Sequence, residues 1–305
     1  MMQNILLELL YVMCGIISFI AAYYAFNGKE QECRIGTSLF WAILGLVFTI
    51  GRYIPKNVVG AMILVMAILA AFKQVRVGKF FTSSPEFKEK KAAEIGNKLF
   101  VPALAIAVAA FGIAQFTKLG GLVGLGIGAV IALLISFVTT GARIDEATRE
   151  SARLLHQVGP ASILPQLLAA LGALFNAAGV GEVISKGIGA ILPADNITLG
   201  VIAYCVGMAL FTIIMGNAFA AFAVITAGVG VPFVLNQGAD PAVAAALAMT
   251  AGYCGTLMTP MAANFNIVSA SILELKDKYM IIKKQIPVGI VLLIIHIILM
   301  LVLAF

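Results

Sequence analysis

Long apolar segments separated by short polar loops are the feature that most constrains how this sequence can fold. The first half holds five of them, at 4–26, 36–54, 58–72, 99–116 and 119–140, and each is near the ~20 residues that a helix needs to cross a bilayer. Of the 305 residues, 62% are hydrophobic and only 11% are charged, which excludes a soluble domain of this size. The sequence therefore predicts an all-α polytopic membrane protein.

The basic residues concentrate in three loops, at 73–98, 143–157 and 274–285. Short loops rich in Lys and Arg stay on the cytoplasmic side of a membrane, so five crossings before residue 143 place the N-terminus outside. Ser84-Pro85 predicts the start of a short surface helix in the first loop, and 143–157 has the spacing of an amphipathic helix. The net charge of +6 follows from this loop bias. We therefore expect the lipid bilayer, and no nucleic acid, as a partner.

Two helices of the second half are interrupted within apolar sequence. The apolar arms 197–215 and 218–235 meet at a two-residue turn with no charge, which favours a re-entrant hairpin over two complete crossings, although the charge pattern fits both. The helix that starts at Pro241 is expected to break at Gly255-Thr256 and to resume beyond the next proline. Irregular backbone at membrane depth is tolerated only where it is buried in protein or lines a cavity. These interruptions therefore predict a binding cavity.

Polar and helix-breaking residues gather at the hairpin tip and at the helix break. The predicted substrate-binding residues are Gly216, Asn217, Gly255, Thr256, Thr259, Pro260, Asn264 and Asn266. Half-helix N-termini can bind an anionic group, and exposed oxygens can hold a cation. We expect a small anionic substrate, specifically a carboxylate, with Na⁺ or H⁺ as coupling ion, and a Na⁺ would lie near Asn217 and Thr256. The alternative is that these side chains only form hydrogen bonds between helices.

Motifs of common enzyme classes are missing from the sequence. It contains no His-Glu-x-x-His, no Gly-x-Ser-x-Gly, no P-loop and no pair of acidic residues inside a span. The four cysteines lie far apart and form no metal-ligand pattern. We therefore expect no enzymatic activity, no catalytic residue and no cofactor.

Two motifs carry a resemblance to known carriers. Met-Gly-Asn-Ala-Phe-Ala-Ala-Phe from Met215, followed by Gly-Tyr-Cys-Gly-Thr-Leu-Met-Thr-Pro from Gly252, resembles one repeat of the ion transporter superfamily, which includes divalent-anion, dicarboxylate and citrate carriers. In that superfamily a Ser-Asn-Thr tip precedes a broken helix, and a mobile domain carries substrate by an elevator movement. The resemblance matches Asn217 to the tip amide, while Gly216 and Ala218 replace its hydroxyl residues.

The full length and the stretches Gly-Asn-Ala-Phe and Ala-Ala-Asn-Phe-Asn resemble, more closely, bacterial 5-oxoproline (pyroglutamate) transporter subunits. That resemblance implies a multi-pass subunit of a secondary transporter in the bacterial cytoplasmic (inner) membrane, paired with a second, smaller membrane subunit. Superfamily carriers have two inverted sets of hairpin and broken helix, whereas this sequence shows one. The other set is expected from that second subunit, in a hetero-oligomer, or alternatively from a second copy of this chain, in a homodimer.

The expected organisation has four parts. They are scaffold transmembrane helices at 1–141 with the cytoplasmic loop 73–98, a cytoplasmic amphipathic linker helix at 142–159, a transport module at 160–272 with its hairpin at 197–235 and broken helix at 241–272, and a cytoplasmic loop and last transmembrane helix at 273–305. The predicted function is elevator-like transport of 5-oxoproline. The alternatives are transport of another small mono- or dicarboxylate, and a non-transporting membrane scaffold.

Overall fold

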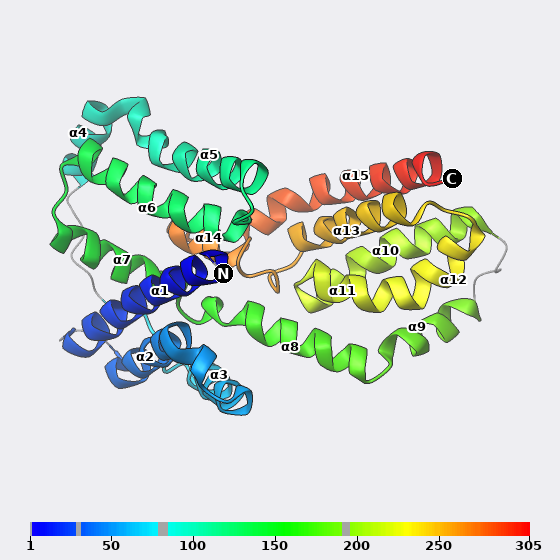
Figure 1. Cartoon of the computed structure of the whole chain (residues 1–305), viewed down its shortest axis with the longest axis horizontal. Coiled ribbons are helices and arrows are strands. Elements are labelled where there is room, and N and C mark those ends of the chain that lie inside the picture. Colours follow the sequence, from blue (N-terminus) through cyan, green and yellow to red (C-terminus); the bar gives the residue numbers. More distant parts are fainter. Residues whose placement is uncertain (1, 29–31, 79–84, 191–195) are drawn as a thin grey trace. The chain divides into compact units, whose positions relative to one another are not determined.

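The computed structural model describes residues 2–28, 32–78, 85–190 and 196–305. Over these residues the chain is helical and contains no strand, which confirms the predicted all-α fold. The backbone divides into two compact units, Met1–Gly159 and Pro160–Phe305, each with its own packed helices (Figure 1).

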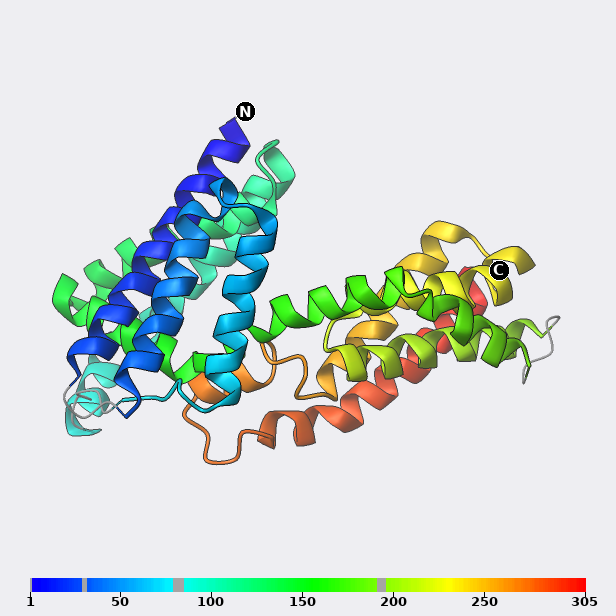
Figure 2. The same cartoon turned by 90° about the horizontal axis from the view of Figure 1, so that it is seen from below.

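The helices of the first unit lie close to the five predicted apolar segments and to the two predicted polar helices. They are α1 (Met2–Asn27), α2 (Arg34–Ile50), α3 (Lys56–Ala71), α4 (Pro85–Ile95), α5 (Val101–Phe116), α6 (Gly121–Thr140) and α7 (Ile144–Val158). The helix expected after Ser84 is α4, and Ser84 itself lies outside the described residues. Figure 2 shows α1 and α2 side by side.

Glycines let the helices of the first unit approach closely. A Cβ on Gly124 would lie 2.9 Å from the Cα of Ala110, and one on Gly128 would lie 3.0 Å from the Cα of Ile106. The first distance is shorter than real Cβ atoms show and the second is tighter than most Cβ contacts, so these glycines allow α6 to pack closely against α5.

The amphipathic helix α7 packs against α1. His156 is buried, its Nε2 lies 2.9 Å from the carbonyl oxygen of Ala21, and its ring stacks on that of Trp41. The opposite side of α7 is charged and exposed, and Arg149 pairs there with Asp145 at 3.0 Å. The helix thus has one face for the protein and one for water.

The second unit is arranged around α10, whose buried side chains form the centre of its core. Its helices are α8 (Leu164–Ala177), α9 (Val180–Gly189), α10 (Ile197–Met215), α11 (Ala218–Ile225), α12 (Val231–Phe233), α13 (Pro241–Leu257), α14 (Ile267–Ile272) and α15 (Met280–Leu303). Tyr204, Cys205 and Met208 of α10 pack with residues of α11, α13 and α15. The last helix is therefore part of the same packed unit as the hairpin.

The second arm of the hairpin is not a uniform α-helix. It continues from α11 through a π-helical turn at Thr226–Gly230 into α12. The Thr226 hydroxyl lies 2.8 Å from the Tyr204 hydroxyl of α10. This hydrogen bond ties the irregular turn to the core.

Two predicted boundaries in the second unit are wrong. The helix expected to break at Gly255-Thr256 continues to Leu257, because Gly255 packs against the backbone of Ala209 on α10 instead of ending the helix. The irregular segment therefore covers residues 258–266. The last helix, expected from residue 286, begins at Met280, since a run of good helix formers precedes the apolar sequence.

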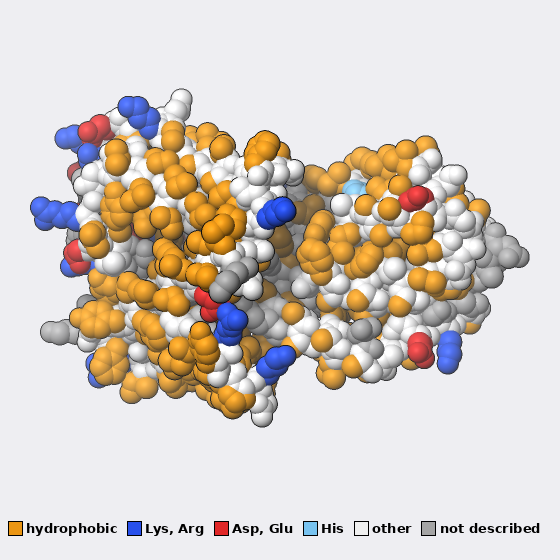
Figure 3. Space-filling model, viewed as in Figure 1, with side chains coloured by type: hydrophobic (Ala, Val, Ile, Leu, Met, Phe, Trp, Pro, Cys, Tyr) orange, Lys and Arg blue, Asp and Glu red, His pale blue; other side chains and the backbone are white. Residues whose placement is uncertain are grey.

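The surface and the helix lengths are those of a polytopic membrane protein. Among the described residues, eight helical segments are long and apolar enough to cross a membrane. Hydrophobic side chains cover much of the visible face of each unit (Figure 3). Such extensive exposed apolar surface is stable when it faces lipid.

Candidate functional site

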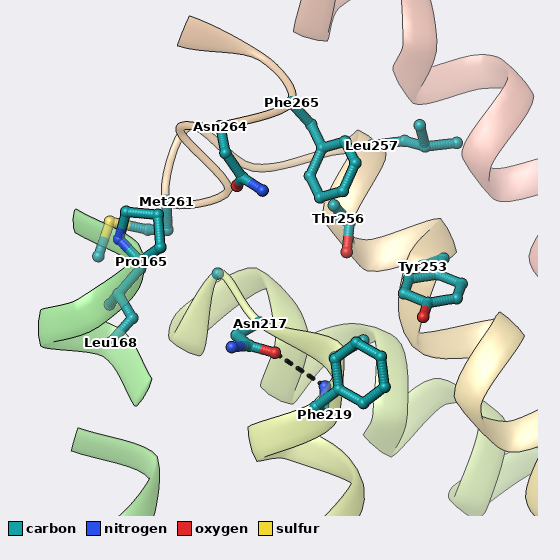
Figure 4. Close-up of a pocket in the computed structure, with 12 residues that line it drawn as sticks. Pro165, Leu168, Asn217, Phe219, Tyr253, Thr256, Leu257, Met261, Asn264 and Phe265 are labelled. Carbon is teal, nitrogen blue, oxygen red and sulfur yellow. Dashed lines mark hydrogen bonds between the residues drawn. The ribbon is translucent and has the colours of Figure 1, made fainter. Parts of the chain in front are cut away.

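A cavity of about 430 Å³ lies within the second unit, where the hairpin tip meets the irregular segment 258–266 (Figure 4). Helix α8 closes one side and the end of α13 another. Its lining residues are Pro165, Leu168, Gly216, Asn217, Ala218, Phe219, Tyr253, Thr256, Leu257, Met261, Asn264 and Phe265.

The hairpin tip needs glycine at its first position for two reasons. Gly216 has a φ of 66°, in the left-handed region that favours glycine. A Cβ there would also lie 2.5 Å from the carbonyl oxygen of Met261. Gly216 thus ends α10 and lets the irregular segment approach the tip.

Asn217 caps the second arm of the hairpin. Its Oδ1 accepts a hydrogen bond from the backbone N–H of Phe219 at 2.9 Å, as an N-cap residue does. Because the cap uses only the side-chain oxygen, the two N–H groups of Asn217 Nδ2 can donate hydrogen bonds to a ligand. The N-terminus of α11 also carries partial positive charge, which favours an anion.

The irregular segment is held by a buried amide. Asn266 is fully buried, and its Nδ2 donates to the carbonyl oxygens of Thr256 at 2.9 Å and Thr259 at 2.7 Å. The Thr259 hydroxyl donates to the carbonyl oxygen of Ile213 at 2.8 Å and accepts from the N–H of Met261 at 3.1 Å. These bonds satisfy carbonyl groups in the last turns of α13 and α10 and backbone groups of the irregular segment itself.

The cavity combines a few polar groups with an apolar wall. Figure 4 shows the side chains of Thr256 and Asn264 directed toward the hairpin tip, where Asn217 lies, and all three residues line the cavity. The rings of Phe219 and Tyr253 meet edge to face at 6.2 Å, and none of the described lining residues is charged. The site can therefore donate hydrogen bonds to a small polar ligand and contact its apolar part.

Four of the eight predicted site residues line the cavity: Gly216, Asn217, Thr256 and Asn264. The other four predicted residues lie outside the lining. Gly255 packs on α10, Thr259 and Asn266 hold the irregular segment, and Pro260 is exposed outside the lining.

Most of the lining residues not singled out from the sequence are apolar. Ala218, Phe219 and Phe265 lie within the quoted motifs, so the motifs contained a signal for them. Pro165 and Leu168 come from α8, and only the tertiary packing of α8 on the hairpin brings them to the site. No local pattern could have identified these two residues.

The described residues do not form a cluster of charged or soft metal ligands. Among the residues that the structure describes, no group of three or more His, Cys, Asp and Glu side chains could hold a metal ion. The oxygens near the cavity are those of amides, hydroxyls and backbone carbonyls, which suit a hard cation such as Na⁺.

The fold and the site together define a polytopic all-α membrane protein in which a helical hairpin and an interrupted helix meet at a cavity. The chain belongs to the DUF979 family, described as "Protein of unknown function (DUF979)", whose model matches residues 8–305. Among solved structures, the YdaH transporter of Alcanivorax borkumensis is similar at 17% identity and a TM-score of 0.32, and the match covers 95% of this chain and 64% of that one. This chain thus spans less than two thirds of that transporter chain. No curated protein matches the sequence.

Proposed function

We propose that this chain is a membrane subunit of a secondary transporter for a small organic anion, with 5-oxoproline as the substrate. One observation carries the proposal: the hairpin tip and the end of α13 converge on a cavity lined by Asn217, Thr256 and Asn264. Interrupted helices that meet at a cavity are typical of substrate sites in secondary transporters. A cavity of about 430 Å³ lies at the small end of ligand sites, which suits a small carboxylate.

The proposed binding mode divides the substrate between the polar and apolar sides of the cavity. The carboxylate accepts hydrogen bonds from Asn217 Nδ2 and from Asn264, near the positive end of α11. Phe219 and Tyr253 contact the ring. Since none of the described lining residues is a lysine or an arginine, the protein binds the anion without a fixed positive side-chain charge, and the anion can leave readily.

The coupling ion binds at the end of α13, where the helix dipole is negative, whereas it is positive at the start of α11. A helix C-terminus carries partial negative charge and open carbonyl groups. A Na⁺ near Thr256 would offset the carboxylate charge and couple its movement to the ion gradient. A proton is the alternative coupling ion.

The transport step that we propose is an elevator-like movement of the second unit. The division of the backbone into two compact units supports a moving part and a scaffold. In this mechanism residues 197–235 form a re-entrant hairpin from the outside, and two full crossings are the alternative, since 218–237 is long enough to span.

Equilibrium binding of labelled 5-oxoproline tests the substrate. The assembly is purified from its native membrane so that any associated subunit is retained. We expect saturable binding that 5-oxoproline displaces better than succinate or citrate. If a dicarboxylate displaces it better, the chain carries another small carboxylate; if nothing binds to folded protein, the transport proposal fails.

A non-transporting scaffold is the second candidate function. It is favoured by the exposed, charged face of α7, where Arg149 and Asp145 are open to a partner. A scaffold predicts that substitutions in the cavity have no effect, whereas loss of the α7 surface releases the partner.

A further inference from the structure

A second cavity lies in the first unit and has a volume of about 440 Å³. It forms a groove along the seam between α5 and α6. Its wall is apolar over most of its length, with Pro102, Ala103 and Ile106 from α5 and Ala129 and Leu133 from α6. Helix α5 contributes no buried residue, so the groove opens on a face that the described chain leaves uncovered. In a membrane protein such a face meets lipid.

The polar lining residues of this groove gather at one end. Lys98 lies in the 3₁₀ turn Gly96–Phe100 before α5, and Ser136, Thr139 and Thr140 lie in the last turns of α6. Because α5 and α6 are antiparallel neighbours joined by a short turn, the start of one helix adjoins the end of the other. The groove thus changes from polar to apolar along its length, as one leaflet of a bilayer does.

The groups at the polar end have complementary hydrogen-bonding capacities. The hydroxyls of Ser136, Thr139 and Thr140 already donate to carbonyl oxygens four residues earlier, at 2.8, 2.7 and 2.7 Å. Their remaining capacity is to accept hydrogen bonds. The Thr140 oxygen already accepts one from the N–H of Ala142 at 3.2 Å and keeps a second lone pair. The Lys98 ammonium has no ion pair or hydrogen bond among the described residues, and it can only donate.

We propose that this groove binds one phospholipid with a phosphodiester and an uncharged, hydroxylated headgroup, of the phosphatidylglycerol type. An acyl chain lies along Ala103, Ile106 and Ala129, and the phosphate pairs with Lys98. The headgroup hydroxyls donate to the oxygens of Ser136 and Thr140. A phosphatidylethanolamine headgroup fits less well, because its ammonium carries the same charge as Lys98.

Native mass spectrometry of the full chain tests this proposal. Delipidated protein in mild detergent is titrated with phosphatidylglycerol and, separately, with phosphatidylethanolamine. Wild type is expected to bind one phosphatidylglycerol in preference to phosphatidylethanolamine. Lys98→Gln is expected to weaken phosphatidylglycerol binding about fivefold, the usual contribution of one lysine at an anionic lipid surface.

Two further variants separate the groove from general surface charge. Ala129→Leu keeps Lys98 but fills the groove at an exposed position, so we expect it to weaken binding as well. Lys118→Gln changes an exposed lysine at the turn between α5 and α6, outside the groove, and should leave binding unchanged. Equal binding of both lipids, an effect of Lys118→Gln equal to that of Lys98→Gln, or unchanged binding by Lys98→Gln or Ala129→Leu overturns the proposal.

Discussion

Asn217 caps α11 with its side-chain oxygen, which leaves its nitrogen available to donate, and we propose that this nitrogen binds the substrate. Aspartate keeps the capping oxygen but replaces the donor with a negative charge. We therefore predict that Asn217→Asp has the thermal stability of wild type and binds 5-oxoproline more than about tenfold more weakly, since like charges at close range repel by several kcal/mol. Thermal unfolding and equilibrium binding measure the two effects separately.

The matched control for that variant is Asn236→Asp. Asn236 is exposed in the same unit and lies outside the cavity lining, so the same charge change there should alter neither quantity. Unchanged substrate binding by Asn217→Asp would remove Asn217 from the site.

Asn264 and Asn266 are two residues apart and have opposite expected roles. Asn266→Ala leaves the carbonyls of Thr256 and Thr259 without their partner, at about 1–3 kcal/mol for each buried group, so its unfolding midpoint should fall clearly. Asn264 is exposed at the cavity, so Asn264→Ala should keep that midpoint and lose affinity. A lower unfolding midpoint with Asn264→Ala, together with lost affinity but an unchanged midpoint with Asn266→Ala, would contradict these roles.

At the scale of elements, we expect Gly255 to stabilise the protein because it lets α13 pack closely against α10. A Cβ on Gly255 would clash with the backbone of Ala209, and overpacking of this kind destabilises by about 1–3 kcal/mol. We predict that Gly255→Ala lowers the thermal stability of the protein. Gly60→Ala is the control, because nothing lies within 4 Å of the added Cβ. Equal stability of the two variants would contradict this packing role.

The same elements show what local sequence could predict. The turn at Gly216-Asn217 is predictable, because a glycine followed by an asparagine between two apolar arms is a local signal for a helix end and a new N-cap. The end of α13 is not, because whether Gly255 ends the helix or packs within it depends on α10, which lies far away in the sequence. Leu168 is unpredictable for a similar reason, since α8 has no motif and only packing brings it to the cavity.

At the scale of the whole molecule, the part of the chain that the structure describes has one hairpin and one interrupted helix around the cavity. We proposed from this single set that a second, smaller membrane subunit completes the transporter, with a second copy of this chain as the alternative. Native mass spectrometry of the assembly from its native membrane should therefore show an additional, smaller membrane chain or a dimer. A monomer that transports alone would contradict the need for a second set.

Uptake of labelled 5-oxoproline into proteoliposomes tests the central claim most directly. The assembly is reconstituted with wild type, Asn217→Asp or Asn236→Asp, under a Na⁺ gradient and, separately, a pH gradient. We predict uptake by wild type and Asn236→Asp under one of the gradients, which identifies the coupling ion, and strongly reduced uptake by Asn217→Asp at substrate concentrations below saturation. Uptake by Asn217→Asp at the wild-type rate, or no uptake by well-folded wild type, would contradict it.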